Sequence, residues 1–122
     1  MSPDSEFLRR VDAAEEVEIE TRLRSGESRR TIIWIVTDGG NVYVRSVRGP
    51  GGRWYKRLTA DPAGAIHLAG ARTPVRAVPV TDGAEIERVS EALRRKYARH
   101  RSSLASMLRP ETLPTTLRLE PA

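Results

Sequence analysis

Apolar and polar side chains alternate along Val17–Leu23, the pattern of a strand with one buried and one solvated face. The turn residues Ser25–Ser28 follow, and a second strand is predicted to start near Arg30. This strand would include Ile32–Val36, a β-branched run that does not alternate. Such a run is typical of a strand covered on both faces, as in a barrel or at a dimer interface.

The next segment predicts a hairpin, a loop and a short helix. Asp38–Asn41 contains two glycines, which accept the positive φ of a tight turn, and Val42–Val47 would return as a third strand. Gly49–Gly52 is too rich in glycine and proline for regular structure and predicts a mobile loop. Arg53–Ala60 predicts a helix that ends before Asp61-Pro62, because a residue before proline avoids the α region.

Three more strands are predicted, over Ala65–Ala69, Arg72–Val80 and Thr112–Leu119. Pro74 and Pro79 lie in the second of these and favour a position at the edge of the sheet, since proline cannot donate to a strand ladder.

Helical periodicity marks both ends of this strand-rich region. An amphipathic helix is predicted at about residues 4–16 and a longer one at about 83–100, with a further helical turn over Ser102–Leu108. Asp82 and Glu85 form a capping-box pattern at the start of the long helix. The apolar stripe of that helix consists of Ile86, Val89, Leu93 and Tyr97.

Together these elements predict a mainly β (α+β) fold, a six-stranded antiparallel barrel with two or three peripheral helices. No βαβ alternation indicates a doubly wound sheet. The length of 122 residues corresponds to a single domain, 1–122.

The sequence lacks the residues that several classes of functional site require. The chain has no cysteine and only two histidines, without the spacing of a metal site, so no metal ligand is assigned. It contains neither a nucleophile-elbow serine nor a Walker or Rossmann glycine pattern. No apolar run reaches the length of a membrane helix, and residues 1–7 do not resemble a signal peptide, so we expect no membrane association and a cytoplasmic location.

The net charge of +5 is concentrated in the middle of the chain. Residues 39–80 contain seven of the basic residues and one acid, Asp61, whereas the remainder is close to neutral. A localised basic field attracts anions such as phosphates or nucleic acid, although a solvated basic face would have the same composition. Five cations lie within thirteen residues without an acid among them, at Arg45, Arg48, Arg53, Lys56 and Arg57.

Aromatic and cationic side chains are interleaved in this segment. Guanidinium groups bind phosphate in bidentate fashion, and Trp54 and Tyr55 could stack on a planar ligand or instead anchor the short helix in the core. Arg29 and Arg30 precede the second strand and could add positive charge to the same binding surface at the mouth of the barrel.

These residues carry a family resemblance. The turn Ser25–Arg29, the hairpin that returns to Tyr43–Ser46, and the helix Trp54–Pro62 resemble the split β-barrel flavin and deazaflavin superfamily. Within it the chain is most similar to the bacterial domain-of-unknown-function 2255 family, over nearly its whole length, and more distantly to the deazaflavin-dependent nitroreductases. The helix matches the pattern W-Y-x-x-L-x-A-[DN]-P of that branch. The chain departs from the branch at Arg22, Ile32 and Arg57, where glycine, proline and asparagine are expected.

The resemblance implies a split barrel that binds a deazaflavin of the F-420 type or FMN and transfers hydride to an unknown acceptor. It assigns the turn arginine, Arg29, to the cofactor phosphate, the strand end and loop at Arg45, Ser46 and Arg48 to wrapping the cofactor, and the Trp-Tyr helix to the ring site. The implied cofactor-binding residues are Arg29, Arg30, Arg45, Ser46, Arg48, Trp54, Tyr55 and Arg57.

Two alternative functions stay open beside this one, and so does the choice of a catalytic residue. No catalytic residue is selected, although Tyr43, Tyr55 or Ser46 could donate a proton. The same basic surface would suit a non-catalytic module for an anionic ligand or, less readily, for nucleic acid. A barrel without a cofactor could serve as a partner domain, and the superfamily often forms homodimers through its sheets, with which the apolar strand Ile32–Val36 is compatible.

Overall fold

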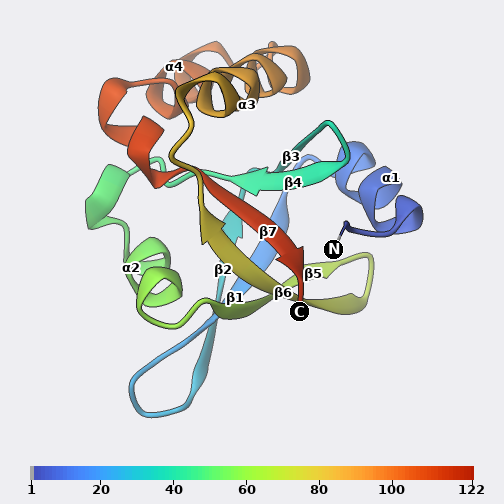
Figure 1. Ribbon diagram of the computed structural model, residues 1–122, viewed down its shortest axis with the longest axis vertical. Coiled ribbons are helices and arrows are strands. Elements are labelled where there is room, and N and C mark those ends of the chain that lie inside the picture. The colour runs from blue at the N-terminus through green and yellow to red at the C-terminus, as the bar shows by residue number, and fades with distance from the viewer. Residues whose placement is uncertain (1) are drawn as a thin grey trace.

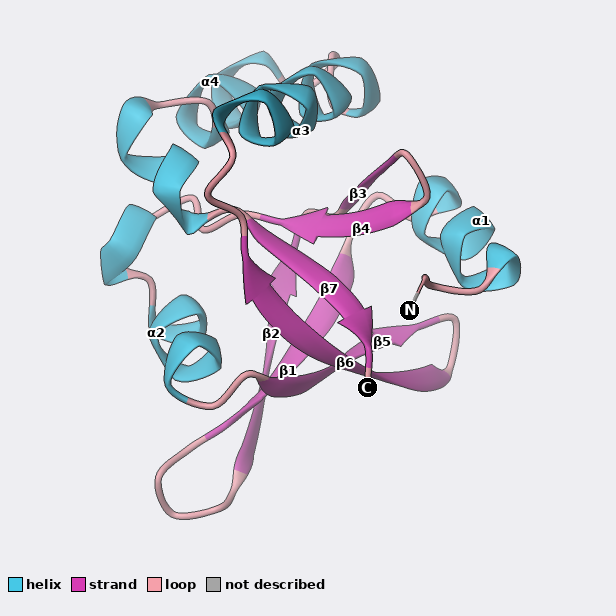
Figure 2. Ribbon diagram, in the orientation of Figure 1, coloured by secondary structure: helices cyan, strands magenta, loops and turns pink. Residues whose placement is uncertain are grey.

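The computed structural model describes residues 2–122 and contains seven antiparallel strands, one more than predicted, which curl into a half-barrel (Figures 1 and 2). The strands are β1 (Val17–Arg22), β2 (Ser28–Ile33), β3 (Val36–Asp38), β4 (Asn41–Val44), β5 (Ala63–Leu68), β6 (Ala71–Pro79) and β7 (Leu117–Pro121). Their order in the sheet is β2-β1-β5-β6-β7-β4-β3, so β2 and β3 are its edges.

Four α-helices and two 3-10 helices accompany the sheet, where two or three helices were predicted. They are α1 (Ser5–Ala13), η1 (Gly49–Gly51), α2 (Arg53–Ala60), α3 (Gly83–Lys96), α4 (Arg101–Met107) and η2 (Pro110–Thr115). Thus α1 and α3 are both a few residues shorter than the pattern predicted, and α2 has the predicted bounds.

The prediction of one strand covered on both faces through Ile32–Val36 is wrong. β2 ends at Ile33, the chain bends at Trp34 and Ile35, and β3 begins at Val36. Ile32 is 62% exposed because it lies on the outer face of an edge strand. The bend carries the chain from one edge of the half-barrel to the other, and two edges cannot share one straight strand.

The prediction that prolines place Arg72–Val80 at a sheet edge is also wrong, because β6 lies between β5 and β7. Pro79 is the last residue of β6, and pairing with β7 begins only at Val75. Pro74 therefore pairs with β5 alone, and its missing N–H removes no bond to a second neighbour.

The Gly49–Gly52 segment is ordered, contrary to the predicted loop. It forms η1, in which the Gly52 N–H donates to the Gly49 carbonyl at 3.1 Å and Ser46 Oγ donates to the same carbonyl at 2.8 Å. The predicted last strand over Thr112–Leu119 is likewise split, since residues 110–115 form η2 and only the remainder enters β7. η1 packs against η2.

The barrel interior holds the main core. The predicted inward face of β1 is confirmed, with Val17, Ile19 and Thr21 buried. Helix α1 contributes Val11 and α2 contributes Trp54 and Leu58 to the same cluster. The two helices therefore cover the interior of the curled sheet from different sides (Figure 1).

A second core lies outside the sheet, between the strands β3 and β4 and the helix pair α3 and α4 (Figure 2). The predicted stripe of α3 faces it through Val89, Leu93 and Tyr97. The predicted N-cap is confirmed, since the Glu85 N–H donates to Asp82 Oδ2 at 2.9 Å.

Candidate functional site

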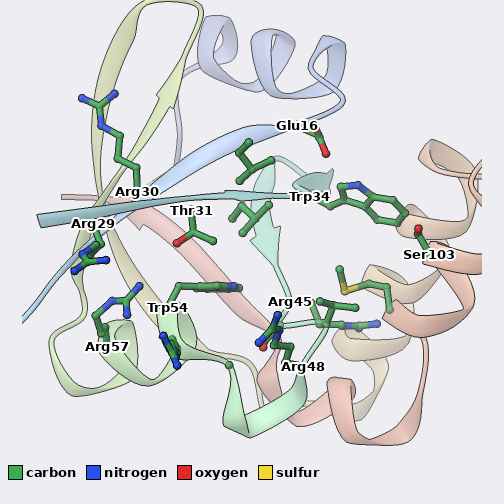
Figure 3. A pocket seen from close by; sticks show the side chains of 17 residues that line it. Glu16, Arg29, Arg30, Thr31, Trp34, Arg45, Arg48, Trp54, Arg57 and Ser103 are labelled. Atoms are coloured by element: carbon green, nitrogen blue, oxygen red, sulfur yellow. The ribbon is translucent and has the colours of Figure 1, made fainter.

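A pocket of about 740 Å³ runs along the free edge of β2 (Figure 3). Residues 29–34 form one wall, and the segment 45–48, the start of α2 and helix α4 supply the others. Among residues 2–122, β2 pairs with β1 alone, so its other side is left open toward this space. The volume is in the range of pockets that hold drug-sized ligands and cofactors.

Arg29 and Arg57 lie at one end of the pocket (Figure 3), and the charge of Arg53, a third pocket residue, acts on Arg57. We call Arg29, Arg53 and Arg57 the arginine cluster. The pKa of Arg57 is lowered by burial and by the positive charges of Arg29 and Arg53. The Arg57 guanidinium is fixed by a hydrogen bond from its Nε to Thr21 Oγ1 at 2.8 Å. Figure 3 shows Arg29 and Arg57 side by side, one from the strand and one from the helix.

None of the three arginines forms an ion pair with an acid of residues 2–122. Like charges held together without a carboxylate repel one another, and an anion that binds between them relieves this repulsion. The cluster is therefore suited to a phosphate group, which guanidinium groups can hold in bidentate fashion.

Arg30 occupies a different position from Arg29. Successive side chains of a strand point to opposite faces, and the Arg30 guanidinium lies 3.7 Å from Glu18 on the outer face of β1. Arg30 borders the pocket along the strand edge, but Figure 3 shows its side chain directed away from Arg29.

Arg45 is part of the scaffold. It is 2% exposed, and its guanidinium donates to Thr116 Oγ1 and Ser90 Oγ at 3.0 Å each and to the Ile86 carbonyl at 3.1 Å. Burial lowers the pKa of Arg45 to about 10, so the group stays charged at neutral pH. Its donors are directed at the protein, although the residue also lines the pocket.

Two further predicted residues, Ser46 and Arg48, line the pocket. Ser46 is buried, its N–H bonds Thr115 Oγ1 at 2.9 Å, and its hydroxyl is engaged with η1. Arg48 is exposed and has no ion-pair partner within the described chain, so its guanidinium is available to a ligand.

The aromatic pair of α2 is divided between core and surface. Trp54 is 8% exposed, belongs to the barrel core and reaches the pocket wall. Tyr55 packs edge-on against it at a centroid distance of 6.3 Å and does not line the pocket. All of the predicted site residues except Tyr55 thus border the pocket, but Arg30 is directed to the outer face and the Arg45 donors are bound within the protein.

The two further candidates for proton donation are both engaged elsewhere. The Tyr43 hydroxyl donates to Glu85 Oε2 at 2.6 Å in the outer core, away from the pocket, and burial raises the pKa of Tyr43 to about 12. The Ser46 hydroxyl already has the partner described above.

Of the seventeen residues that line the pocket, ten were not assigned from the sequence, and three of these ten carry charge or a large aromatic ring: Glu16, Trp34 and Arg53. Arg53 lies in the basic run and could have been included on charge alone. Trp34 lies within an apolar run that predicted only a core strand, and nothing local distinguishes it from its neighbours.

Two general findings concern the residues that the structure describes. No helix among them is long and apolar enough to cross a membrane. Nor do residues 2–122 bring together three or more histidine, cysteine, aspartate or glutamate side chains in a group that could hold a metal ion.

The curled antiparallel sheet with helices packed on it has the architecture of a split barrel, and an arginine-lined pocket lies at its open edge. The chain belongs to a bacterial family described as an uncharacterized protein conserved in bacteria (DUF2255), whose model matches residues 7–119. No curated protein matches the sequence.

Solved structures share this fold at low identity. An F420-H2 dependent reductase (FDR-A) is similar with a TM-score of 0.66 at 16% identity, over 87% of this chain and 94% of its own. The heme storage protein HutZ from Vibrio cholerae is similar with a TM-score of 0.67 at 14% identity, over 100% and 92%. A third structure, described as a domain-swapped dimer, has a TM-score of 0.66 at 18% identity, over 87% and 80%. At such identities the likeness establishes the fold alone.

Proposed function

We propose that this protein binds a phosphate-bearing flavin-type cofactor, a deazaflavin of the F-420 type or FMN, in the pocket along β2. The observation that carries the proposal is the arginine cluster, three guanidiniums at one end of a cofactor-sized pocket without an ion-pair partner in residues 2–122. The likeness to an F420-H2 dependent reductase supports the proposal at the level of the fold.

The residues of the pocket fit such a group better than they fit heme, which the name of another neighbour suggests. Within the described residues neither histidine lines the pocket: His67 is hydrogen-bonded to Glu20 on the outer face of the sheet, and His100 to Glu15. Heme iron is commonly held by an axial histidine. A phosphate-bearing ring needs only cations and an apolar wall, and the pocket has both.

When bound, a flavin or deazaflavin supplies hydride chemistry. The chain would hold the phosphate at Arg29, Arg53 and Arg57, with Arg48 beside the linking chain. Ser46 and Gly52 would line the pocket beside it. Transfer of hydride to an unknown acceptor is the reaction that we infer for the loaded protein.

Titration of the purified protein with FMN and with oxidised F-420, followed by cofactor fluorescence, tests this proposal. We expect saturable binding, weakened by Arg57→Gln about 10-fold or more because one charge-assisted contact is lost. Arg76→Gln is the matched control, since Arg76 is exposed on the outer face and has no contact with the pocket.

Absence of saturable binding with either cofactor would overturn the proposal. Binding of a labelled single-stranded oligonucleotide that weakens steeply with salt would favour the alternative of a nucleic-acid module. Saturable binding of heme alone would instead favour the role named for the heme neighbour.

We also infer that the chain forms a homodimer along the same open edge. The two large apolar side chains that are most exposed in the described chain, Ile32 at 62% and Val47 at 40%, both border the pocket. A fold neighbour described as a domain-swapped dimer is consistent with assembly. Sedimentation equilibrium should give the dimer mass, and Ile32→Glu should shift it toward the monomer.

A further inference from the structure

We propose that the pocket binds its ligand in one direction, with the planar ring on Trp34 and the anionic group in the arginine cluster. This inference rests on the proposed function and names the residue that recognises the ring. It assigns that role to a side chain in the bend between β2 and β3, and not to the aromatic pair of α2.

The indole of Trp34 is prepared for stacking. Tyr97 covers one of its faces in parallel, with a centroid distance of 3.8 Å and an interplanar angle of 1°. His100 lies beside the same ring at a centroid distance of 5.8 Å and a tilt of 48°, and Trp34 lines the pocket, where a ligand can meet the indole. Figure 3 shows this indole at the far end of the pocket from Arg29 and Arg57. A planar ligand ring would extend an existing stack.

The stack is held rigidly by the C-terminal end of α3. The Tyr97 hydroxyl accepts a hydrogen bond from the Ile35 N–H at 3.1 Å and donates to the Glu15 carbonyl at 2.7 Å. Lys96 Nζ donates to the carbonyls of Ile35 and Val11, at 2.7 and 2.8 Å. These bonds fix the bend that carries Trp34, so ordering the platform costs little when a ligand arrives.

Charge gives the pocket its direction. Glu16 is the single acid among the described residues that line the pocket, and it lies at the Trp34 end, whereas Arg29 and Arg57 lie at the other (Figure 3). Arg53 belongs with these two arginines, because its charge acts on Arg57. A phosphate is attracted to the arginine cluster and repelled from the vicinity of Glu16. The reverse orientation would place the phosphate near a carboxylate and leave the cluster unneutralised.

The spacing along β2 is compatible with this arrangement. Arg29 and Ile33 are four residues apart within β2, which corresponds to roughly 13 Å at about 3.3 Å per residue, and Trp34 follows in the bend. A planar heteroaromatic ring joined through a short chain to a phosphate spans such a distance. The alternative platform, Trp54, has its side chain packed in the barrel core with only 8% exposed and sits next to the arginines.

Calorimetric titration of the full chain with FMN, and with inorganic pyrophosphate in competition against FMN, separates the two ends. We expect Trp34→Leu to weaken FMN binding about 10-fold, the usual scale of one lost stacking contact, and to leave the pyrophosphate affinity unchanged. The double variant Arg53→Gln/Arg57→Gln should weaken both ligands. Trp34→Phe keeps an aromatic face and should retain most of the FMN affinity, which guards against a merely structural effect.

Three results would overturn the binding direction. The first is an FMN affinity that Trp34→Leu leaves unchanged. The second is an equal loss of affinity for FMN and for pyrophosphate in Trp34→Leu, while Trp34→Phe behaves as the wild type. The third is FMN binding that pyrophosphate does not displace. Failure of the wild type to bind any flavin-type cofactor would instead overturn the proposed function itself, so the two failures are distinguishable.

Discussion

Arg45 offers a test of whether a buried arginine beside the pocket belongs to the ligand site or to the scaffold. The guanidinium joins β4's end to the start of β7 through Thr116 and to α3 through Ser90 and Ile86. The resemblance assigns this residue to wrapping the cofactor, whereas its contacts indicate a structural role. We therefore expect substitution of Arg45 to change the free energy of unfolding and to leave ligand affinity almost unchanged.

Two opposing contributions decide how much the free energy of unfolding changes when Arg45 is substituted. Each hydrogen bond of a charged group contributes about 1.5–3 kcal/mol, but burying the charge without a close carboxylate costs several kcal/mol. Arg45→Ala loses the bonds and leaves a cavity, so we expect destabilisation of about 2–4 kcal/mol. Arg45→Met removes the charge while it fills most of the space, and should lie within about 1 kcal/mol of the wild type.

Urea unfolding followed by tryptophan fluorescence gives the free energies, and FMN titration gives the affinities. Arg48→Gln is the matched control, because Arg48 is exposed and three residues away: its free energy of unfolding should change by less than about 0.5 kcal/mol while its affinity falls. Equal destabilisation by Arg45→Met and Arg45→Ala would refute the reasoning about the buried charge. A loss of FMN affinity in Arg45→Met as large as that in Arg57→Gln would return Arg45 to the ligand site.

Two further predictions concern Gly52, which lines the pocket, and Glu20, which lies on the outer face of the sheet. Gly52→Ala should destabilise the fold by about 1–2 kcal/mol and lower the FMN affinity, because a Cβ there would lie 2.3 Å from Ser46 Oγ. Gly51→Ala is the control: the space around its Cβ is open, so its thermal unfolding should match that of the wild type. Glu20 has a pKa lowered to about 2, first by its hydrogen bonds with Arg72 and then by that with His67, so its ionised form stabilises the fold above the unfolded pKa near 4.5. We expect Glu20→Gln to lower the free energy of unfolding by about 1–2 kcal/mol at neutral pH, a value reduced for the solvent exposure of Arg72. The difference between variant and wild type should disappear as the pH falls from 4.5 toward 2. A difference in urea unfolding that does not change with pH would contradict this.

Much of the fold was predictable because it depends on local chemistry. The alternation of β1, the glycine turn before β4, the exact span of α2 and the Asp82 cap follow from side-chain period, positive φ, a following proline and a capping hydrogen bond. These signals act over a few residues, so they do not depend on how distant parts of the chain pack.

The errors all fall where distant segments decide the outcome. Ile32–Val36 breaks into two strands because it joins the two edges of the half-barrel, and Pro74 is tolerated inside the sheet because β7 stops short of it. Gly49–Gly52 is ordered because Ser46 and η2 hold it. Apart from Ser46, which is three residues from Gly49, these partners are distant in sequence.

By itself the sequence determined that a basic, arginine-rich segment would meet a β-rich scaffold, since charge and strand period are written in the order of the residues. Only the tertiary structure decided how those arginines divide. It turns Arg30 to the outer face, buries Arg45 among hydroxyls, and joins Arg29 to two arginines of α2 that lie more than twenty residues away. It also brings Trp34 against Tyr97, a contact across the fold that no local pattern could specify.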